Sequence, residues 1–288
     1  MKITVMSLFR DSESYIHQAL SRFQSLNETK TFSWLTHFDL EFEFFFYEND
    51  SKDSTRSVLQ NWVNRYSENA KLFYEDLCTP KFGSVPDAER LVLLSGYRNK
   101  LKSLAGKLNS TFCVLVDSDV EFTPDHIEML CREIARNDWS MVTANSRAVP
   151  GDVYYDAFTL KDKLLNNGLY HADCPMVLKE DRDRWKNGEA VPVVSAFGGL
   201  AVVRSSFFNK VKWSTTGNCE HVNLCLELGR FGQVCVLPTC NPTIKIDESQ
   251  IYFPTDSFKK RTNQILTEFN SRFERSLETK GPSETIVL

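Results

Sequence analysis

The chain has 288 residues, 42% of them hydrophobic and 12% aromatic, which is enough apolar material for one large folded domain. Its formal net charge of −4 provides no overall positive field, which argues against a partner such as nucleic acid or an anionic membrane bound through global charge. No signal peptide precedes the first apolar segment and no apolar run approaches the ~20 residues of a membrane span, so we expect a cytosolic protein without a transmembrane segment.

Strand and helix patterns alternate through the first 140 residues. Apolar strands are expected at 3–8, 42–48, 71–74 and 112–116, and helices are expected to open at 12–15, to run through 58–63 and 91–108, and to begin at 124. Thr123 and Pro124 suit the cap and the first position of that last helix. Alternation of this kind predicts a mostly parallel central sheet flanked by helices, which is an α/β fold.

The strongest functional signal follows the fourth strand, where the apolar run 112–116 ends in Asp117-Ser118-Asp119. Ligands bind at the carboxyl ends of strands in open α/β sheets. Because side chains alternate along an extended segment, the two carboxylates are expected on one side, where they repel unless a cation lies between them. Oxygen ligands of this kind suit Mg²⁺ or Mn²⁺ with a diphosphate. The alternative is a strand that ends in a solvated acidic turn.

The pattern loosens from Trp139 onward. Short strands are expected at 193–197, 200–203 and 233–237, and the charged stretch 173–192 is expected to form a long loop near the site. A terminal amphipathic helix at 259–277 and a frayed tail at 281–288 complete the prediction.

Several motifs occur together in a fixed order. They are Arg10-Asp11-Ser12-Glu13, the segment 47–55, Arg98-Asn99, Asp117-Ser118-Asp119, Tyr154-Tyr155-Asp156, Phe197-Gly198-Gly199 and Cys219-Glu220-His221. In this combination the chain resembles glycosyltransferases of the GT-A fold that use nucleotide sugars, most closely the fungal capsule-associated and α-1,3-mannosyltransferase group. The resemblance implies a GT-A domain over 1–255, with a nucleotide-binding half at 1–140 and an acceptor-binding half with a small antiparallel elaboration at 141–255. Residues 256–288 are expected to form a C-terminal helix and tail.

The same resemblance implies transfer of a hexose from a GDP- or UDP-sugar to a hydroxyl of a glycan or glycoconjugate, with Mn²⁺ or Mg²⁺ on the diphosphate. It implies Asp119 as direct metal ligand and His221 as a further ligand. Asp117 would reach the metal through water or contact the ribose. The alternative for a single histidine is a structural role.

Residues at the strand ends and on the helix before the fourth strand are candidates for holding the nucleotide sugar: Arg10, Glu48, Asp50, Arg98, Asp117, Ser118, Gly198 and Gly199. The alternatives are a turn and helix cap for the acids of the second strand and an exposed surface charge for Arg98. Gly198 and Gly199 permit close approach of the backbone to a ligand, but a tight bend between two strands explains the pair equally well.

On the acceptor side, Glu220 is the first candidate for a general base, after a turn at Gly217-Asn218, and Asp156 is the second. Tyr154, Tyr155 and Trp185 suit either stacking against sugar rings or packing in the core. Two other classes remain open. A nucleotidyltransferase usually carries a glycine-rich basic loop after its first strand, which 8–12 lacks, and a non-catalytic sugar-binding protein would bind sugars without a nucleotide.

Overall fold

The computed structural model describes residues 1–35, 39–82, 88–169, 171, 173–214 and 219–246. Its elements in chain order are β1 (Lys2–Phe9), α1 (Ile16–Glu28), β2 (Glu41–Asn49), α2 (Thr55–Arg65), β3 (Ala70–Glu75), α3 (Ala88–Ala105), β4 (Phe112–Val116), β5 (Val120–Glu121), α4 (Pro124–Arg136), β6 (Trp139–Ala144), β7 (Arg147–Val149), β8 (Val153–Tyr154), α5 (Lys179–Lys186), β9 (Val191–Val193), β10 (Leu200–Arg204), α6 (Ser205–Phe208), α7 (Glu220–Leu228), β11 (Gln233–Leu237) and β12 (Thr243–Lys245). The expected helix at 259–277, the tail, the boundary at 255 and the Gly217-Asn218 turn lie outside the described residues.

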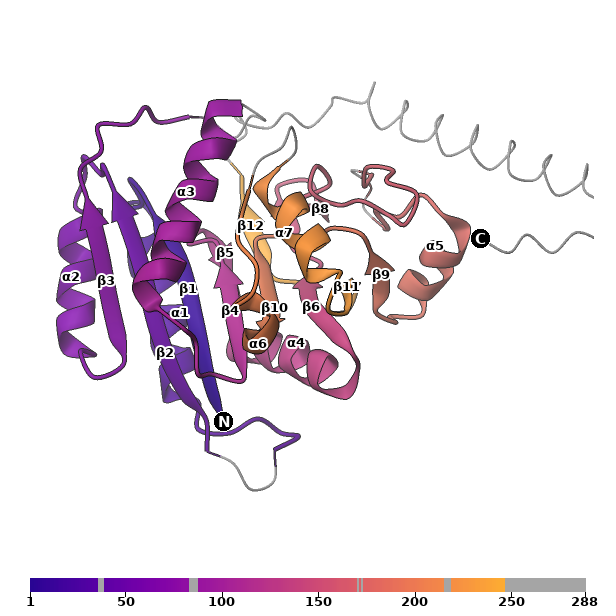
Figure 1. Cartoon of the computed structure of the whole chain (residues 1–288), viewed down its shortest axis with the longest axis horizontal. Coiled ribbons are helices and arrows are strands. Elements are labelled where there is room, and N and C mark those ends of the chain that lie inside the picture. Colours follow the sequence, from indigo (N-terminus) through magenta and orange to yellow (C-terminus); the bar gives the residue numbers. More distant parts are fainter. Residues whose placement is uncertain (36–38, 83–87, 170, 172, 215–218, 247–288) are drawn as a thin grey trace, which may run out of the picture.

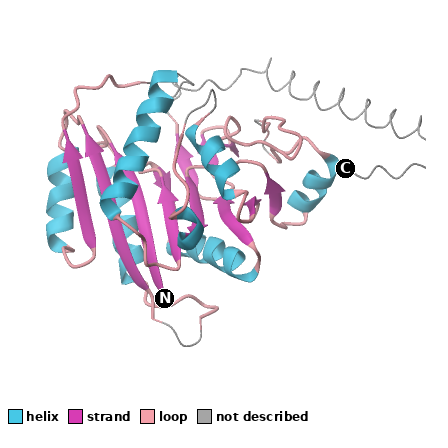
Figure 2. Ribbon diagram, viewed as in Figure 1, coloured by secondary structure: helices cyan, strands magenta, loops and turns pink. Residues whose placement is uncertain are grey.

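An eight-stranded sheet runs through the molecule in the order β3-β2-β1-β4-β10-β6-β11-β9 (Figure 2). The strands β3, β2, β1 and β4 are parallel, as the alternating pattern predicted. β10 is antiparallel to both β4 and β6, so β4 and β6 run in the same direction. The carboxyl ends of β1, β2, β4 and β6 therefore lie at one edge of the sheet.

Helices cover both faces of this sheet (Figure 1). One core packs against α1, α2 and α4, and the other packs against α3, α6 and α7. β2 shows why its sequence is almost continuously apolar: Phe44 and Phe46 belong to the first core, whereas Phe45 and Tyr47 belong to the second. None of the helices in the described part of the chain combines the length and the hydrophobicity of a membrane span.

A smaller sheet in the order β5-β12-β7-β8 lies beside the main one. Two of its three pairings are antiparallel, and β12 pairs with β7 in parallel. β5 begins at Val120, directly after Asp119, so the small sheet fixes the chain where it leaves the acidic segment.

The prediction of a loop at 173–192 is wrong over part of its length, because Lys179–Lys186 form the helix α5. Only Asp181 and Trp185 of this helix are buried, and two residues four apart give too weak a helical period to stand out among charged neighbours. The strand expected at 193–197 instead ends at Val193. Pro192 lies inside β9, which an outermost strand tolerates because one of its edges needs no hydrogen bonds.

Candidate active site

Asp117-Ser118-Asp119 follow β4 at the carboxyl edge of the sheet. The N–H of Asp117 donates to the carbonyl of Gly199 at 2.8 Å, which ties the acidic segment to the turn before β10. Ser118 is buried, and its hydroxyl lies 3.1 Å from that of Tyr15. Asp117 and Asp119 stay partly exposed. The serine therefore serves an internal contact while both carboxylates remain partly exposed. The alternation expected of an extended segment does not apply here, because β4 ends at Val116 and the N–H of Val120 donates to the carbonyl of Asp117 at 3.2 Å in a turn.

The two carboxylates influence each other strongly. Burial and the neighbouring charge of Asp117 raise the pKa of Asp119 to about 6. Burial also raises the pKa of Asp117, although the Arg98 guanidinium opposes this effect. Two interacting carboxylates, of which Asp117 pairs with Arg98, form a site whose negative charge a cation would help to balance.

Arg98 on α3 connects the acidic segment to α7. It is 9% exposed, which excludes the alternative of a free surface charge. Its Nη2 donates to Oδ1 of Asp117 at 3.0 Å, and its Nε donates to Oε1 of Glu220 at 3.4 Å. The guanidinium also lies over the ring of Phe197, 5.4 Å from the centroid. Arg98, Asp117 and Glu220, far apart in the sequence, thus form one ionic group, in which Arg98 and Glu220 are buried and Asp117 is partly exposed.

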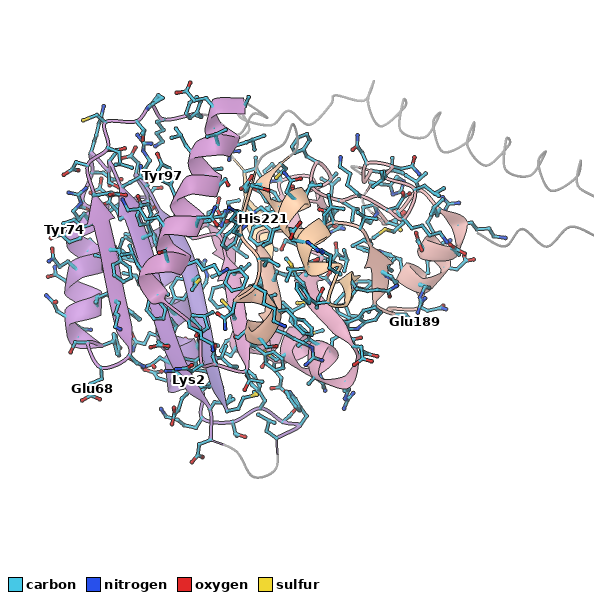
Figure 3. The ribbon with its side chains drawn as sticks, in the orientation of Figure 1. Lys2, Glu68, Tyr74, Tyr97, Glu189 and His221 are labelled. Carbon is cyan, nitrogen blue, oxygen red and sulfur yellow. The ribbon has the colours of Figure 1, made fainter. Side chains whose placement is uncertain are left out.

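His221, the second residue of α7, lies next to this group (Figure 3). Its ring stacks on Phe197 at 3.6 Å between centroids, and its Nε2 lies 3.5 Å from Oε1 of Glu220. Both ring nitrogens are buried, and neither has a hydrogen-bond partner among the described residues. Burial and the charges of Arg98 and Arg90 lower the pKa of His221 well below its usual value. The imidazole is therefore neutral, the form that binds metals.

The residues present fit a divalent cation that shares its ligands with a substrate. Among the described residues, no three His, Cys, Asp or Glu side chains converge into a complete metal site. The partly exposed acids and the unpartnered imidazole supply an incomplete set, and Mg²⁺ and Mn²⁺ commonly complete their octahedral shell with phosphate oxygens.

Arg10 and Asp50 both contact the loop that follows β3. Arg10 donates to the carbonyls of Thr79 and Pro80 at 2.7 and 3.0 Å. Asp50 accepts hydrogen bonds from the backbone of 77–79 and from the Thr79 hydroxyl. Burial acts to raise the pKa of Asp50, but the hydrogen bonds from Thr79, Asn49 and Cys78 hold it well below its usual value. Both residues therefore hold the loop after β3 against the ends of β1 and β2, and their contact with a nucleotide stays a prediction.

Glu48 is fully buried, and its contacts match the alternative to nucleotide binding, which is a role in the turn after β2. Oε1 accepts the N–H of Ser51 at 2.8 Å, and Oε2 forms an ion pair with Arg56 on α2. Arg56 in turn pairs with Asp76 after β3. Glu48 thus joins three segments at the edge of the sheet.

Replacing Glu48 with Ala is expected to lower the free energy of unfolding by about 2–4 kcal/mol, because it leaves Arg56 without its buried partner. Glu43→Ala is the matched control, since Glu43 forms a surface pair with Lys2 and its loss should cost less than about 1 kcal/mol. Urea unfolding measures both. If the two variants lose equal stability and the Glu48 variant also binds the donor more weakly, Glu48 binds the nucleotide instead.

Asp156, Gly198 and Gly199 form a second group beside the acidic segment. Asp156 accepts hydrogen bonds from Thr159 at 2.8 Å and from the N–H of Gly198 at 3.3 Å, and burial raises its pKa to about 7. Gly198 and Gly199 have φ of 63° and 71°, and a Cβ on Gly198 would lie 2.5 Å from the carbonyl oxygen of Ala144. The bend itself therefore requires both glycines.

The three aromatic candidates divide into two groups. Tyr154 and Trp185 are buried and pack edge to face at 6.5 Å, which matches the core alternative. Tyr155 is partly exposed, and burial followed by the charges of Asp119 and Asp117 raises its pKa well above the usual value. Tyr155 is the aromatic residue of the three that the structure brings near the acidic pair.

Two residues of the site were not predicted from the sequence. Tyr15 bridges Ser12 and Ser118 through its hydroxyl. Arg90 lies eight residues before Arg98 on α3, and its positive charge acts on Asp117, His221 and Tyr155. A spacing of eight residues turns an α-helix about 80° beyond two full turns, so both arginines lie within one broad helix face, and this spacing could have indicated that both face the acids.

Fold and site together define a GT-A glycosyltransferase architecture. Residues 43–263 match the family described as cryptococcal mannosyltransferase 1, and the chain belongs to this family. No curated protein sequence matches the chain significantly.

Solved structures share this architecture at low sequence identity. The mannosyltransferase PcManGT from Pyrobaculum calidifontis, in complex with GDP-Man and Mn²⁺, aligns with a TM-score of 0.53 and 12% identity over 98% of this chain and 65% of its own. S. aureus TarS residues 1–349 align with a TM-score of 0.51 and 18% sequence identity. The alignment covers 94% of this chain and 71% of that chain. GalNAc-T7 with UDP, GalNAc and Mn²⁺ aligns with a TM-score of 0.55 and 14% sequence identity. The alignment covers 85% of this chain and 44% of that chain. The chain thus spans about two thirds of PcManGT and less than half of GalNAc-T7.

Proposed function

We propose that the chain transfers a hexose, with mannose the first candidate, from a nucleoside diphosphate sugar to a hydroxyl of a glycan or glycoconjugate, with Mn²⁺ or Mg²⁺ on the diphosphate. The observation that carries the proposal is the pair of partly exposed carboxylates, Asp117 and Asp119, at the carboxyl edge of the sheet, with the Arg98 guanidinium against Asp117. The family description and the GDP-Man bound to PcManGT support mannose and a GDP donor.

In this proposal three residues bind the cation and two others position them. Asp119, Asp117 and His221 would hold the cation, which when bound stabilises negative charge on the departing diphosphate. Arg98 keeps Asp117 in place and brings positive charge beside the phosphate position. The stacked ring of Phe197 fixes His221.

The acceptor hydroxyl needs a group that takes its proton or orients it. The Glu220 carboxylate is 2% exposed and is surrounded by Arg98, His221 and the Cys219 thiol, an environment that suits a positioning role. Asp156 holds Gly198 through one oxygen and Thr159 through the other. Because its pKa lies near neutrality, Asp156 is the carboxylate better suited to exchange a proton.

A thermal-shift series is expected to show stabilisation by GDP-mannose with Mn²⁺ that disappears in excess chelator. A donor at 100 times its dissociation constant should add about 2.7 kcal/mol to the free energy of unfolding. UDP-GlcNAc with Mn²⁺ and mannose alone are the matched ligand controls. Stabilisation by mannose alone would support the sugar-binding class instead, and stabilisation that survives chelation would contradict the metal site.

A further inference from the structure

A cavity lies at the edge of the sheet opposite the candidate active site. It has a volume of about 1110 Å³, and its walls come from the carboxyl end of α3, the segment 106–110 before β4, and the segment 206–212 after β10. Figure 1 shows the lower end of α3 and α6 at the end from which β4 starts. Because β10 is antiparallel to β4, both loops flank the amino end of β4, about 15 Å or more from Asp117 at its other end.

The chemistry of this cavity differs from that of the rest of the chain. Four lysines line it, namely Lys102, Lys107, Lys210 and Lys212, and no acidic side chain is among the described residues of its wall. Within the described residues no carboxylate forms an ion pair with any of the four. In a chain with a net charge of −4, this is a local concentration of unneutralised positive charge.

Two of these lysines are held in place by aromatic rings. Nζ of Lys102 lies 4.8 Å from the ring centroid of Phe208 and also contacts the carbonyl of Val211. Nζ of Lys210 lies 5.0 Å from the centroid of Phe231, and Phe231 stacks on Phe207. Rings that restrict a lysine reduce the entropy it would lose on binding a ligand.

The walls are also joined to each other by paired hydrogen bonds. Asn99 accepts from the N–H of Trp213 at 2.9 Å and donates to its carbonyl at 2.7 Å. Asn209 exchanges the same pair of bonds with Leu108, each at 3.0 Å. The cavity is therefore formed before any ligand enters, because its three walls are already tied together.

We propose that this cavity binds a ligand that carries two or more clustered phosphate groups. Clustered phosphates match several ammonium groups around one space, whereas a single carboxylate would leave most of them unpaired. Ser103, Asn109 and Ser206 also line the wall and carry neutral hydrogen-bond donors. The site is separate from the donor diphosphate site and does not depend on the proposed transferase activity. Its ligand is either a soluble polyphosphorylated compound or the headgroup of a phosphorylated lipid.

The test uses the full chain and inorganic tripolyphosphate, with chelator present so that metal-dependent binding at Asp117 and Asp119 does not contribute. Calorimetry should show binding that weakens by about tenfold to a hundredfold in the double variant Lys107→Gln with Lys210→Gln. The matched control is Lys71→Gln with Lys179→Gln, which removes two exposed lysines elsewhere and should leave the affinity unchanged. Binding should also fall with added salt.

Sedimentation with vesicles distinguishes the two ligand sources. Vesicles of phosphatidylcholine with a minor fraction of phosphatidylinositol bisphosphate should retain the wild-type chain but not the Lys107/Lys210 variant if the ligand is a lipid headgroup. Tripolyphosphate binding without vesicle retention identifies a soluble ligand. Absence of both kinds of binding in the wild-type chain, or equal weakening in the two double variants, overturns the proposal.

Discussion

Replacing Asp119 with Asn is expected to lower transferase activity at least about 10²-fold while leaving the fold intact. The substitution keeps the volume of the side chain but removes the charge of the residue best placed to hold the cation. Asp119 is partly exposed at the end of β4, so no core packing is lost. Its mutual repulsion with Asp117 also disappears, and the stability of the variant should equal or slightly exceed that of the wild type.

Initial rates with GDP-mannose and Mn²⁺, together with urea unfolding, measure this expectation. Asp138→Asn is the matched control, because Asp138 is an exposed aspartate between α4 and β6, at the edge away from the site. Activity of the Asp119 variant within a few-fold of the control would remove Asp119 from the metal site.

The sequence predicted the half of the fold where local pattern and buried environment agree. β4 and β11 begin and end at the expected residues, and Thr123 caps α4 with Pro124 at its first position. These segments are apolar on both faces or carry strong capping signals. The parallel order of β1 to β4 followed from the alternation of strands and helices.

The elements after Trp139 were harder to predict from the sequence because they depend on contacts with residues distant in the sequence. β6 is one of the central strands, yet its residues Trp139 to Ala144 mix polar and apolar types and carry no clear period. α7 begins at Glu220, a buried carboxylate that is stabilised by Arg98 from α3. Propensity cannot show such a contact, because it forms only when the two helices pack together.

The candidate site divides in the same way. Asp117 and Asp119 could be read from a strand followed by two acids, which is a local signal. The same signal is less informative for Glu48, which also ends a strand but pairs with Arg56 on the next helix, so its contact with a nucleotide stays a prediction. Burial of the acid, which decides between these outcomes, depends on the position of Arg56 and is not visible in the local sequence.

Replacing Arg98 with Met is expected to lower the free energy of unfolding by about 3–5 kcal/mol, since it leaves the carboxylates of Asp117 and Glu220 without their shared cation. Methionine retains much of the side-chain volume, so the loss reports the charge rather than a cavity. Lys100→Met is the matched control on the same helix, because Lys100 forms a more exposed ion pair with Glu75 and should cost less than about 1 kcal/mol.

A double-mutant cycle of Arg98→Met with Glu220→Gln measures how much of the lost stability comes from the unpaired Glu220 carboxylate. Glu220→Gln removes the more deeply buried of the two charges, at 3% side-chain exposure against 28% for Asp117. In the Arg98→Met background it should therefore restore part of the lost stability, whereas in the wild-type background it should destabilise. Urea unfolding of the four proteins measures the coupling. Additive effects would show that Arg98 and Glu220 act independently, and Glu220 would then be tested as a base rather than as the residue that positions Arg98 beside the metal ligands.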